Sequence, residues 1–382
     1  MRFPGFTDEW KETTIGDVAK IEKGNGISKT QLSDEGEECI LYGELYTKYK
    51  SEIIDEVYSK TGIDSTKLTR SHVNDVIIPC SGESAEDIAT ARCVKKDGIL
   101  LGGDLNIIRF DRQDGSFMSY QLNGKRKYDI ARVAQGVSVV HLYPDHLKSV
   151  KIYLPQLEEQ QTIVTLLSLI DERIATQTKI IEDLKKLKSA IIDRHFNGLN
   201  ANRRIGELIH EVSNRNKMNT NLPVLSVSNR QGFIAQSEQF ENRIVASDDT
   251  SKYKIVVKND FAYNPARINV GSIARLTNIE SGIVSPMYIC FRCTDELLPE
   301  YLELFFQSRY FQTEVGKRLE GSVRQCLSID GIKSIQFDLI SVPQQSTLAD
   351  RLTIIQSELN NEETIGRLYQ RQRKYLLSQL FI

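Results

Sequence analysis

The chain has few of the residues and segments that mark several large protein classes. Its 382 residues include six cysteines, nine prolines and one tryptophan. Six cysteines in so long a chain do not form a disulfide framework, which is far denser in small secreted proteins. No apolar run is long enough to cross a bilayer, and the N-terminal stretch lacks the apolar core of a signal peptide. These absences predict a reduced, cytoplasmic protein that has no membrane partner.

Catalytic and cofactor-binding motifs are also missing. Gly24-Asn25-Gly26 lacks the third glycine and the later acidic residue of a dinucleotide site, so we interpret it as a turn. Cys290 and Cys293 have a metal-like spacing, but a closed zinc site needs four ligands and no second pair completes one. We expect both to be core or incidental thiols, and we predict no catalytic residue and no metal site.

What the sequence does contain is one internal repeat, at an offset of 185 residues. Residues 136–154 align without a gap on residues 321–339. The identical pairs are Gly136/Gly321, Leu142/Leu327, Asp145/Asp330, Lys148/Lys333, Ser149/Ser334 and Leu154/Leu339. A repeat of this length is much longer than a solenoid unit. It predicts a duplicated globular domain, each copy followed by a long helix.

Residues 156–197 and 343–382 have the pattern of these helices, because apolar residues recur every three or four positions along one face. The first stripe consists of Ile163, Leu167, Ile170, Ile174, Ile181, Leu184 and Ile191, and Ile180, Leu187 and Ile192 widen it. The second consists of Leu348, Leu352, Ile355, Leu359, Tyr369 and Leu376. We expect the two helices to pair as an antiparallel coiled coil.

Polar residues interrupt both stripes at the same two places. They are Gln177 and Lys188 in the first helix, and Glu362 and Arg373 in the second. A polar residue buried in such a seam fixes the register of the helices at a cost in stability. Alternatively, these four side chains lie at the edge of the stripe.

The remaining segments, 1–155 and 198–342, are expected to be two related globular domains. Their strand-like segments are 40–42, 76–78, 107–110, 224–227, 254–257 and 288–291, and residues 301–309 have a helical pattern. The predicted fold class is therefore α/β in the mixed α+β sense, with two similar domains joined by two long helices.

A turn at Asn264–Arg267 is the first candidate for contact with a ligand. It resembles the Asn-Pro-Pro-aromatic motif of DNA methyltransferases, but it lacks the second proline and the aromatic ring that stacks on a flipped base. We interpret it as a turn that presents Arg267 and Asn269, since arginine and asparagine can read guanine and adenine edges. The candidates from this turn and its counterpart, residues 79–84, are Asn264, Arg267, Asn269, Ser81 and Glu83.

The net charge of −2 argues against a surface that binds nucleic acid everywhere. Any phosphate-binding surface must therefore be a local patch. Two basic clusters occupy similar places in the two halves, and their members are Lys125, Arg126, Arg132, Arg318 and Arg324. Such clusters are either phosphate contacts or ordinary solvated faces.

Several short motifs, in a fixed order, resemble one known family. They are Arg2–Trp10 with Ile15–Val18, then Leu154-Pro155 with Glu159-Gln160-Gln161, and Leu184–Phe196. Their echoes are Ile205–Leu208, Val342–Gln345 and Tyr375–Phe381. The combination spans the chain and is similar to the specificity subunit of type I restriction–modification systems. One departure is Ile340–Pro343, where the second helix has lost the Leu-Pro-to-Glu pattern of the first.

The resemblance implies a non-catalytic DNA-recognition subunit. Each domain, 1–155 and 198–342, would read one half of a two-part site in double-stranded DNA. The helices, 156–197 and 343–382, would set the gap and dock modification subunits, of which two are expected. These partners would carry S-adenosylmethionine, and separate restriction subunits would use ATP, so that no cofactor is expected on this chain.

Two other classes of function remain open from the residues. One is a DNA methyltransferase with fused recognition domains, which would bind its cofactor as an isolated chain. The other is a coiled-coil scaffold whose globules bind protein, which would lack salt-dependent DNA binding.

Overall fold

The computed structural model describes residues 3, 5–136, 139–229, 231–236, 249–321 and 325–381. The chain divides into two compact units. Unit 1 comprises residues 1–178 with 364–382, and unit 2 comprises residues 179–363. Each unit therefore contains one globule and part of each long helix.

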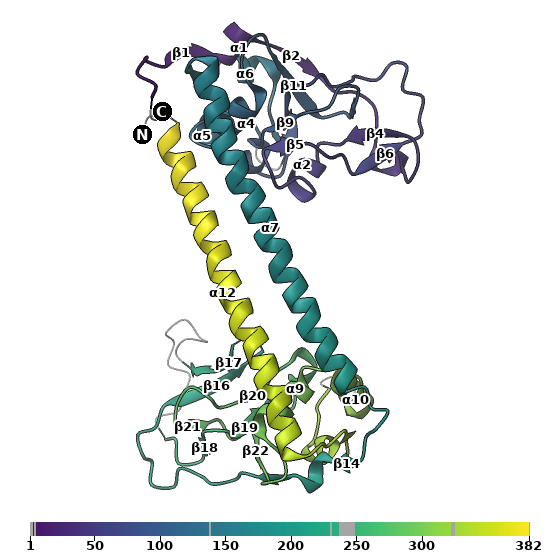
Figure 1. The fold of residues 1–382 in the computed structure, drawn as a ribbon, viewed down its shortest axis with the longest axis vertical. Coiled ribbons are helices and arrows are strands. Elements are labelled where there is room, and N and C mark those ends of the chain that lie inside the picture. The colour runs from purple at the N-terminus through teal and green to yellow at the C-terminus, as the bar shows by residue number, and fades with distance from the viewer. Residues whose placement is uncertain are drawn as a thin grey trace. The chain divides into compact units, whose positions relative to one another are not determined.

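The two long helices, α7 (Leu157–His195) and α12 (Val342–Leu380), have 39 residues each (Figure 1). At 1.5 Å per residue, such a helix is about 58 Å long. In unit 1, Asp171 of α7 pairs with Arg373 near the end of α12. In unit 2, Lys188 near the end of α7 donates to Gln356 in the first half of α12, over 2.8 Å. The helices run antiparallel in both units, which confirms the predicted coiled coil.

The apolar stripe of α7 is narrower than we expected from the sequence. Ile163, Leu167 and Ile170 are buried, but Ile180 is 40% exposed and Leu187 is 49% exposed. These two do not widen the stripe, because two paired helices bury only a thin seam where no globule covers them. Ile192 is buried, since the core of unit 2 packs against it.

The polar residues of the stripes are not all at its edge. Gln177 is only 7% exposed, so the edge interpretation is wrong for this side chain. Lys188, Glu362 and Arg373 are half-buried. The side chain of Arg373 forms ion pairs with Asp171 and Glu52 inside unit 1.

Unit 1 is built on two small sheets. The first has the order β2 (Ala19–Lys23), β11 (Leu105–Phe110), β7 (Asp75–Pro79), β9 (Arg92–Val94) and β5 (Ile53–Ile54). The second has the order β10 (Leu100–Leu101), β4 (Glu37–Ile40), β6 (Ser59–Thr61) and β3 (Leu32–Ser33). Two short pairs are β1 (Lys11–Thr14) with β13 (Lys151–Leu154), and β8 (Ser81–Gly82) with β12 (Val140–His141). The short helices are α1 (Ile15–Val18), η1 (Lys29–Gln31), α2 (Glu44–Thr47), α3 (Ala85–Ile88), α4 (Gly115–Asn123), α5 (Lys127–Val133) and α6 (Pro144–Lys148).

Unit 2 has two corresponding sheets. One has the order β15 (Ile209–Glu211), β22 (Ile289–Cys293), β19 (Phe261–Tyr263) and β20 (Ile273–Arg275). The other has the order β17 (Gly232–Ala235), β16 (Val224–Ser228), β21 (Ser281–Val284) and β18 (Lys254–Val257). A short pair joins β14 (Arg203–Arg204) to β23 (Gln336–Phe337). The short helices are η2 (Ile205–Glu207), η3 (Ile268–Val270), α9 (Pro299–Phe306), α10 (Arg309–Arg318) and α11 (Ile329–Lys333).

Two elements differ from the sequence prediction. Strand β4 ends at Ile40, so Leu41 and Tyr42 lie in the turn that follows it. The helix expected over 301–309 is two helices, since α9 ends at Phe306 and α10 begins at Arg309. Ser308 separates them, because its hydroxyl accepts from the backbone N–H of Phe311 over 3.1 Å and caps α10.

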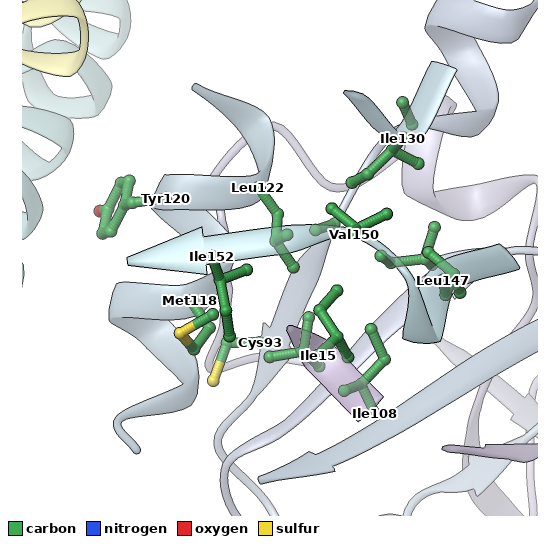
Figure 2. Packing of buried hydrophobic residues seen from close by; sticks show 14 of the residues in the cluster. Ile15, Cys93, Ile108, Met118, Tyr120, Leu122, Ile130, Leu147, Val150 and Ile152 are labelled. Atoms are coloured by element: carbon green, nitrogen blue, oxygen red, sulfur yellow. The ribbon is translucent and has the colours of Figure 1, made fainter. Parts of the chain in front are cut away.

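The cores show why each globule holds its helix. In unit 1, Ile15, Ile108, Leu147, Val150 and Ile152 pack together from different elements (Figure 2). Ile163 and Leu167 of α7 and Leu380 of α12 belong to the same cluster. Burying apolar side chains of this size stabilises by about 1.5–3 kcal/mol each. The helix ends are therefore part of the globular core and not appendages to it.

A buried glutamine anchors the start of each long helix at the same repeat position. In unit 1, Gln160 accepts from the backbone of Asp114 over 2.9 Å and donates to the carbonyl of Pro155 over 3.0 Å. In unit 2, Gln345 accepts from Leu298 over 2.8 Å and donates to the carbonyl of Ile340 over 2.8 Å. Both glutamines are at most 3% exposed. The structural repeat therefore extends to single hydrogen bonds.

Across the described residues, none of the helices combines the length and apolar character needed to span a membrane.

Candidate DNA interface

The turn after β7 is held in unit 1 by a neighbouring hairpin. The backbone N–H of Leu142 donates to the carbonyl of Cys80 over 2.8 Å. Gln135 and His141 exchange two backbone hydrogen bonds, of 2.9 and 2.7 Å, which close the hairpin. Gly136 begins its loop at a φ of 125°, which favours glycine.

Unit 2 repeats this arrangement bond for bond. Leu327 donates to the carbonyl of Pro265 over 3.1 Å, and Glu320 and Cys326 exchange bonds of 2.9 and 2.8 Å. Gly321 begins the loop at a φ of 103°. All these residues are the counterparts of those in unit 1 at an offset of 185. We call this shared arrangement the turn frame. It consists of residues 79–84 with 135–136 and 139–143 in unit 1, and of residues 264–269 with 320–321 and 325–328 in unit 2.

In unit 2, the turn frame and the end of β16 line a cavity of about 490 Å³. Its lining residues are Val227, Ser228, Asn229, Ala266, Arg267, Asn269, Val270 and Ser272. Arg267, Asn269 and Asn229 are exposed at its surface. Two of the predicted contact residues, Arg267 and Asn269, are therefore brought together and offer hydrogen-bond donors to one ligand.

Asn264 has a different position from the other candidates of its turn. It is 8% exposed, and its side-chain oxygen accepts from the backbone N–H of Ala266 over 3.1 Å. Its carboxamide therefore shapes the turn that carries Arg267.

The candidates of unit 1, Ser81 and Glu83, lie in the equivalent turn. Glu83 is exposed, and the backbone carbonyl of Ser81 accepts from the Tyr46 hydroxyl over 3.4 Å. Gly82 takes the place of Arg267, and a Cβ there would lie 3.3 Å from the Tyr46 hydroxyl. Tyr46 thus closes the space that the arginine side chain uses in unit 2.

Three residues that we did not select from the sequence lie at this face of unit 1. The rings of His141 and Tyr143 are stacked, with centroids 6.1 Å apart, and the ammonium of Lys23 lies 5.8 Å from the Tyr143 ring. All three side chains are exposed. The sequence offers one signal for His141 and Tyr143, which is that they flank Leu142. Leu142 is identical in both repeats and is buried.

The side chains of the basic cluster of unit 1, Lys125, Arg126 and Arg132, differ in their contacts. Lys125 is exposed, and Arg132 is 80% exposed with a loose pairing to Asp129 at 3.8 Å. The guanidinium of Arg126, by contrast, pairs with Asp129 at 3.1 Å and lies over the ring of Tyr153. Lys125 and Arg132 are free to meet a phosphate, whereas Arg126 already has partners in its own unit.

In unit 2, Arg318 likewise has internal partners. Its guanidinium donates to the Ser334 hydroxyl over 2.8 Å and forms an ion pair with Glu314. Arg324 lies outside the described residues.

The Cys290 and Cys293 thiols lie in strand β22. Burial raises the pKa of each to about 12, so both stay protonated at neutral pH. A thiol is a poor metal ligand in that form. Among the described residues, no group of three or more His, Cys, Asp or Glu side chains is arranged to hold a metal ion.

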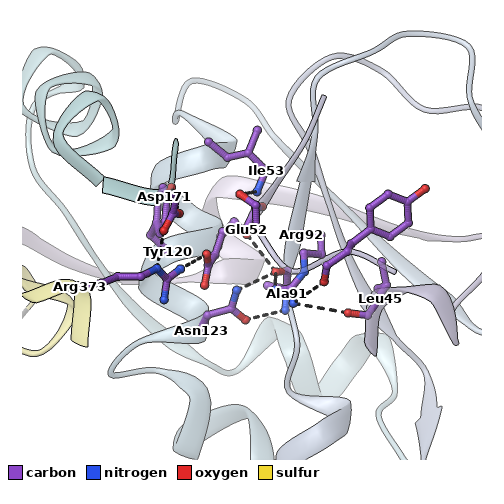
Figure 3. A network of polar contacts seen from close by, with 12 residues as sticks. Leu45, Glu52, Ile53, Ala91, Arg92, Tyr120, Asn123, Asp171 and Arg373 are labelled. Carbon is purple, nitrogen blue, oxygen red and sulfur yellow. Dashed lines mark hydrogen bonds and ion pairs between the residues drawn. The ribbon is translucent and has the colours of Figure 1, made fainter. Parts of the chain in front are cut away.

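A polar network in unit 1 joins Arg373 of α12 to Glu52 and Asp171 (Figure 3). Asp171 also accepts from the Tyr120 hydroxyl over 2.7 Å. Burial raises the pKa of Glu52, and the Arg373 charge opposes this shift. The network ties both long helices to the globule, and its chemistry is structural.

Residues 7–186 match the family model described as the type I restriction modification DNA specificity domain. This part of the chain is therefore similar to the specificity domain of type I restriction–modification systems. A curated relative, the type I restriction enzyme MjaVIII specificity subunit of Methanocaldococcus jannaschii, is 28% identical over 190 residues. That alignment covers 50% of this chain and 42% of the relative, so the chain spans less than half of the relative's length.

Two chains from solved structures of type I restriction–modification systems have a similar fold over nearly the whole chain. The S subunit of the type I restriction-modification system from M. genitalium has a TM-score of 0.63 at 16% identity, covering 100% of this chain and 99% of that one. A chain from a structural study of complex assembly and conformational transition of the type I R-M system has a TM-score of 0.58 at 14% identity. It covers 98% of this chain and 97% of that one. The family resemblance and the predicted fold class are thus confirmed.

Proposed function

We propose that this chain is the DNA-recognition subunit of a type I restriction–modification complex. Each unit reads one half of a bipartite site in double-stranded DNA. The observation that carries this proposal is the turn frame, which occurs twice with the same backbone hydrogen bonds and different exposed side chains. A repeated backbone with varied polar side chains suits two readers of different sequences, because bases are distinguished by side-chain contacts in the grooves.

Two DNA-reading domains in one chain also distinguish the target site from chance matches better than one domain does. A mismatch costs about 1–3 kcal/mol for each base pair, so a short half-site alone is found at many chance positions. Linking two readers makes the second contact intramolecular and multiplies the affinity for a correctly spaced pair. The paired helices α7 and α12 set that spacing and dock the modification subunits, of which we propose two.

The chemistry belongs to the partners in this proposal. The chain itself catalyses nothing, and S-adenosylmethionine is bound by the modification subunits, whereas ATP is used by the restriction subunits. The complex acts in the cytoplasm.

The decisive experiment maps methylated bases in a host genome with and without the gene for this chain. We expect methylation at a two-part sequence with an indifferent centre, and its loss when the gene is removed. A continuous specific block would contradict the proposal. Binding of S-adenosylmethionine to the isolated chain would favour a fused methyltransferase, and DNA binding that salt does not weaken would favour a protein scaffold.

A further inference from the structure

Position 143 carries a different side chain, with different contacts, in each repeat. In unit 2 the counterpart, Ser328, caps helix α11, because its hydroxyl accepts from the N–H of Gly331 over 3.1 Å. In unit 1, Tyr143 stands at the start of α6 and makes no side-chain capping bond. Serine is among the best capping residues, whereas a tyrosine cannot fill this role. Unit 1 therefore forgoes a stabilising contact that unit 2 keeps.

The exposed tyrosine has a defined surrounding instead. Leu142, 1% exposed, is fixed to the turn after β7, so its neighbours His141 and Tyr143 both point outwards from the turn frame. Their rings stack, and Lys23 lies over Tyr143 as in a cation–π pair. The half-buried ring of His146, at the start of α6, packs edge-on against Tyr143 from another side, with centroids 5.5 Å apart. The exposed part of this cluster is one cation and two rings, each of which carries a hydrogen-bonding group.

This cluster lies beside the turn of unit 1 that lacks the arginine of unit 2. Gly82 replaces the exposed Arg267 of unit 2, and the hydroxyl of Tyr46 lies against the space above it. His141 is paired in the β8–β12 ladder with Ser81, the residue beside Gly82. The cluster is therefore anchored on the same turn as the arginine of unit 2.

We infer that His141 and Tyr143 determine the base sequence read by unit 1, with Lys23 holding a backbone phosphate beside them. This inference rests on the proposed DNA-recognition function. Imidazole and phenol groups can donate to and accept from base edges, whereas an ammonium on a flexible stem contacts phosphate without reading sequence.

The test replaces each residue by the one at the equivalent position of unit 2, as Tyr143→Ser and His141→Cys. Methylated sites are mapped for the whole complex, and affinity is measured on its preferred DNA. We expect the half-site of unit 1 to be relaxed or changed, with binding to the original site at least about 10-fold weaker. The half-site of unit 2 and the gap stay the same, which also proves that the complex assembles.

A second measurement separates function from folding. Tyr143→Ser restores a capping hydroxyl, so the melting temperature of the chain is expected to rise or stay equal while sequence reading is lost. Tyr58→Ser is the matched control, since Tyr58 is 61% exposed and lies outside the turn frame. We expect it to leave both half-sites unchanged.

The outcomes are distinct. An unchanged half-site of unit 1 in both variants overturns the inference and leaves the proposed function intact. Loss of reading by both units also overturns it, because the effect would then be general. If no bipartite methylation depends on the wild-type chain, the proposed function itself fails.

Discussion

At the scale of single residues, the two arginines of the α4–α5 segment have opposite surroundings. Arg132 is 80% exposed, whereas Arg126 lies over Tyr153 and pairs with Asp129. We expect Arg132→Ala to lower the slope of log affinity against log salt by about one unit, because one phosphate contact is lost. Binding of DNA titrated at several salt concentrations measures this slope, and an unchanged slope would place the DNA elsewhere on unit 1.

Arg126→Ala is the matched comparison. It should leave the salt slope unchanged and lower the free energy of unfolding by about 1 kcal/mol, the value of a shielded cation–π contact. Denaturant unfolding of both variants checks this division. A reduced slope for Arg126→Ala would show that its guanidinium leaves Tyr153 for the DNA.

His195 gives unit 2 a pH-dependent stability. Its Nε2 lies 2.7 Å from the hydroxyl of Tyr301, and burial lowers its pKa. The unfolded chain therefore takes up this proton at a higher pH than the folded chain does. Neutral His195 makes its full contribution to the free energy of unfolding above a pH of about 6.5, the pKa of histidine in the unfolded chain. This contribution is lost as the pH falls through the lower pKa of His195 in the folded chain.

We expect His195→Gln, which cannot titrate, to lose less stability than the wild type when the pH falls from 7 to 5. Melting temperatures across this range give the comparison. Equal pH dependence of the two proteins would show that His195 is not the titrating group.

Residue-scale prediction from the sequence was uneven for physical reasons. The turn that carries Arg267 and Asn269 is visible because Asn-Pro and the following residues have marked turn preferences. His141 and Tyr143 were missed, since tertiary hydrogen bonds such as that of Leu142 fix which way their side chains point. Whether any of these residues contacts DNA remains a prediction.

At the scale of elements, the repeat places a different polar pair at the same position of the helix pairing. Asp171 and Arg373 meet in unit 1, and their counterparts Gln356 and Lys188 meet in unit 2. Only the pair in unit 1 is a pair of opposite charges, and it has a third partner in Glu52. Arg373 thus holds one end of α12 against the globule of unit 1.

We expect Arg373→Ala to destabilise the protein by about 3–5 kcal/mol, because two largely buried carboxylates lose their counter-charge. Arg371→Ala, two residues away and exposed, should change stability by less than about 0.5 kcal/mol. Denaturant unfolding of the two variants decides. Similar small effects would mean that water or a rearranged side chain neutralises Glu52 and Asp171.

The helices could be predicted from periodicity, since α7 has 39 residues without an internal glycine and α12 keeps the same apolar period despite Gly366. The width of the buried stripe could not. Ile180 and Leu187 continue the apolar pattern, yet both are exposed, and neither belongs to a core cluster of the described residues. Only tertiary contacts show whether an apolar stripe is the narrow seam between two paired helices or a wider face that packs against a globular core.

At the scale of the whole molecule, one domain design is used twice. Each copy should therefore be replaceable on its own, without an effect on what the other copy reads. Replacing residues 198–342 by the corresponding domain of another specificity subunit should change one half-site and leave the other. The reciprocal replacement of residues 1–155 is the control and should change the opposite half-site. Methylation mapping reads both outcomes. A change in both half-sites from a single replacement would contradict modular reading.

The long helices supply a second prediction at this scale. Inserting four residues near Thr176–Thr178 and four near Glu362 adds about 6 Å to each helix. The preferred gap should then change by one or two base pairs, since base pairs rise about 3.4 Å each, while both half-sites stay the same. The unmodified chain is the reference in a methylation map. A changed half-site with an unchanged gap would rule out a role of the helices in spacing.

The buried glutamines at the helix starts fix the rotation of each globule about the axis of its long helix. Because Gln160 and Gln345 bond both to their own helix start and to their globule, a globule must turn with its helix. One inserted residue turns a helix by about 100°, whereas four turn it by about 400°, leaving a net 40°. Insertions of one or two residues should therefore abolish recognition, and insertions of three or four should preserve it. The insertion lengths that preserve DNA recognition would therefore recur about every 3.6 residues, the period of the helix.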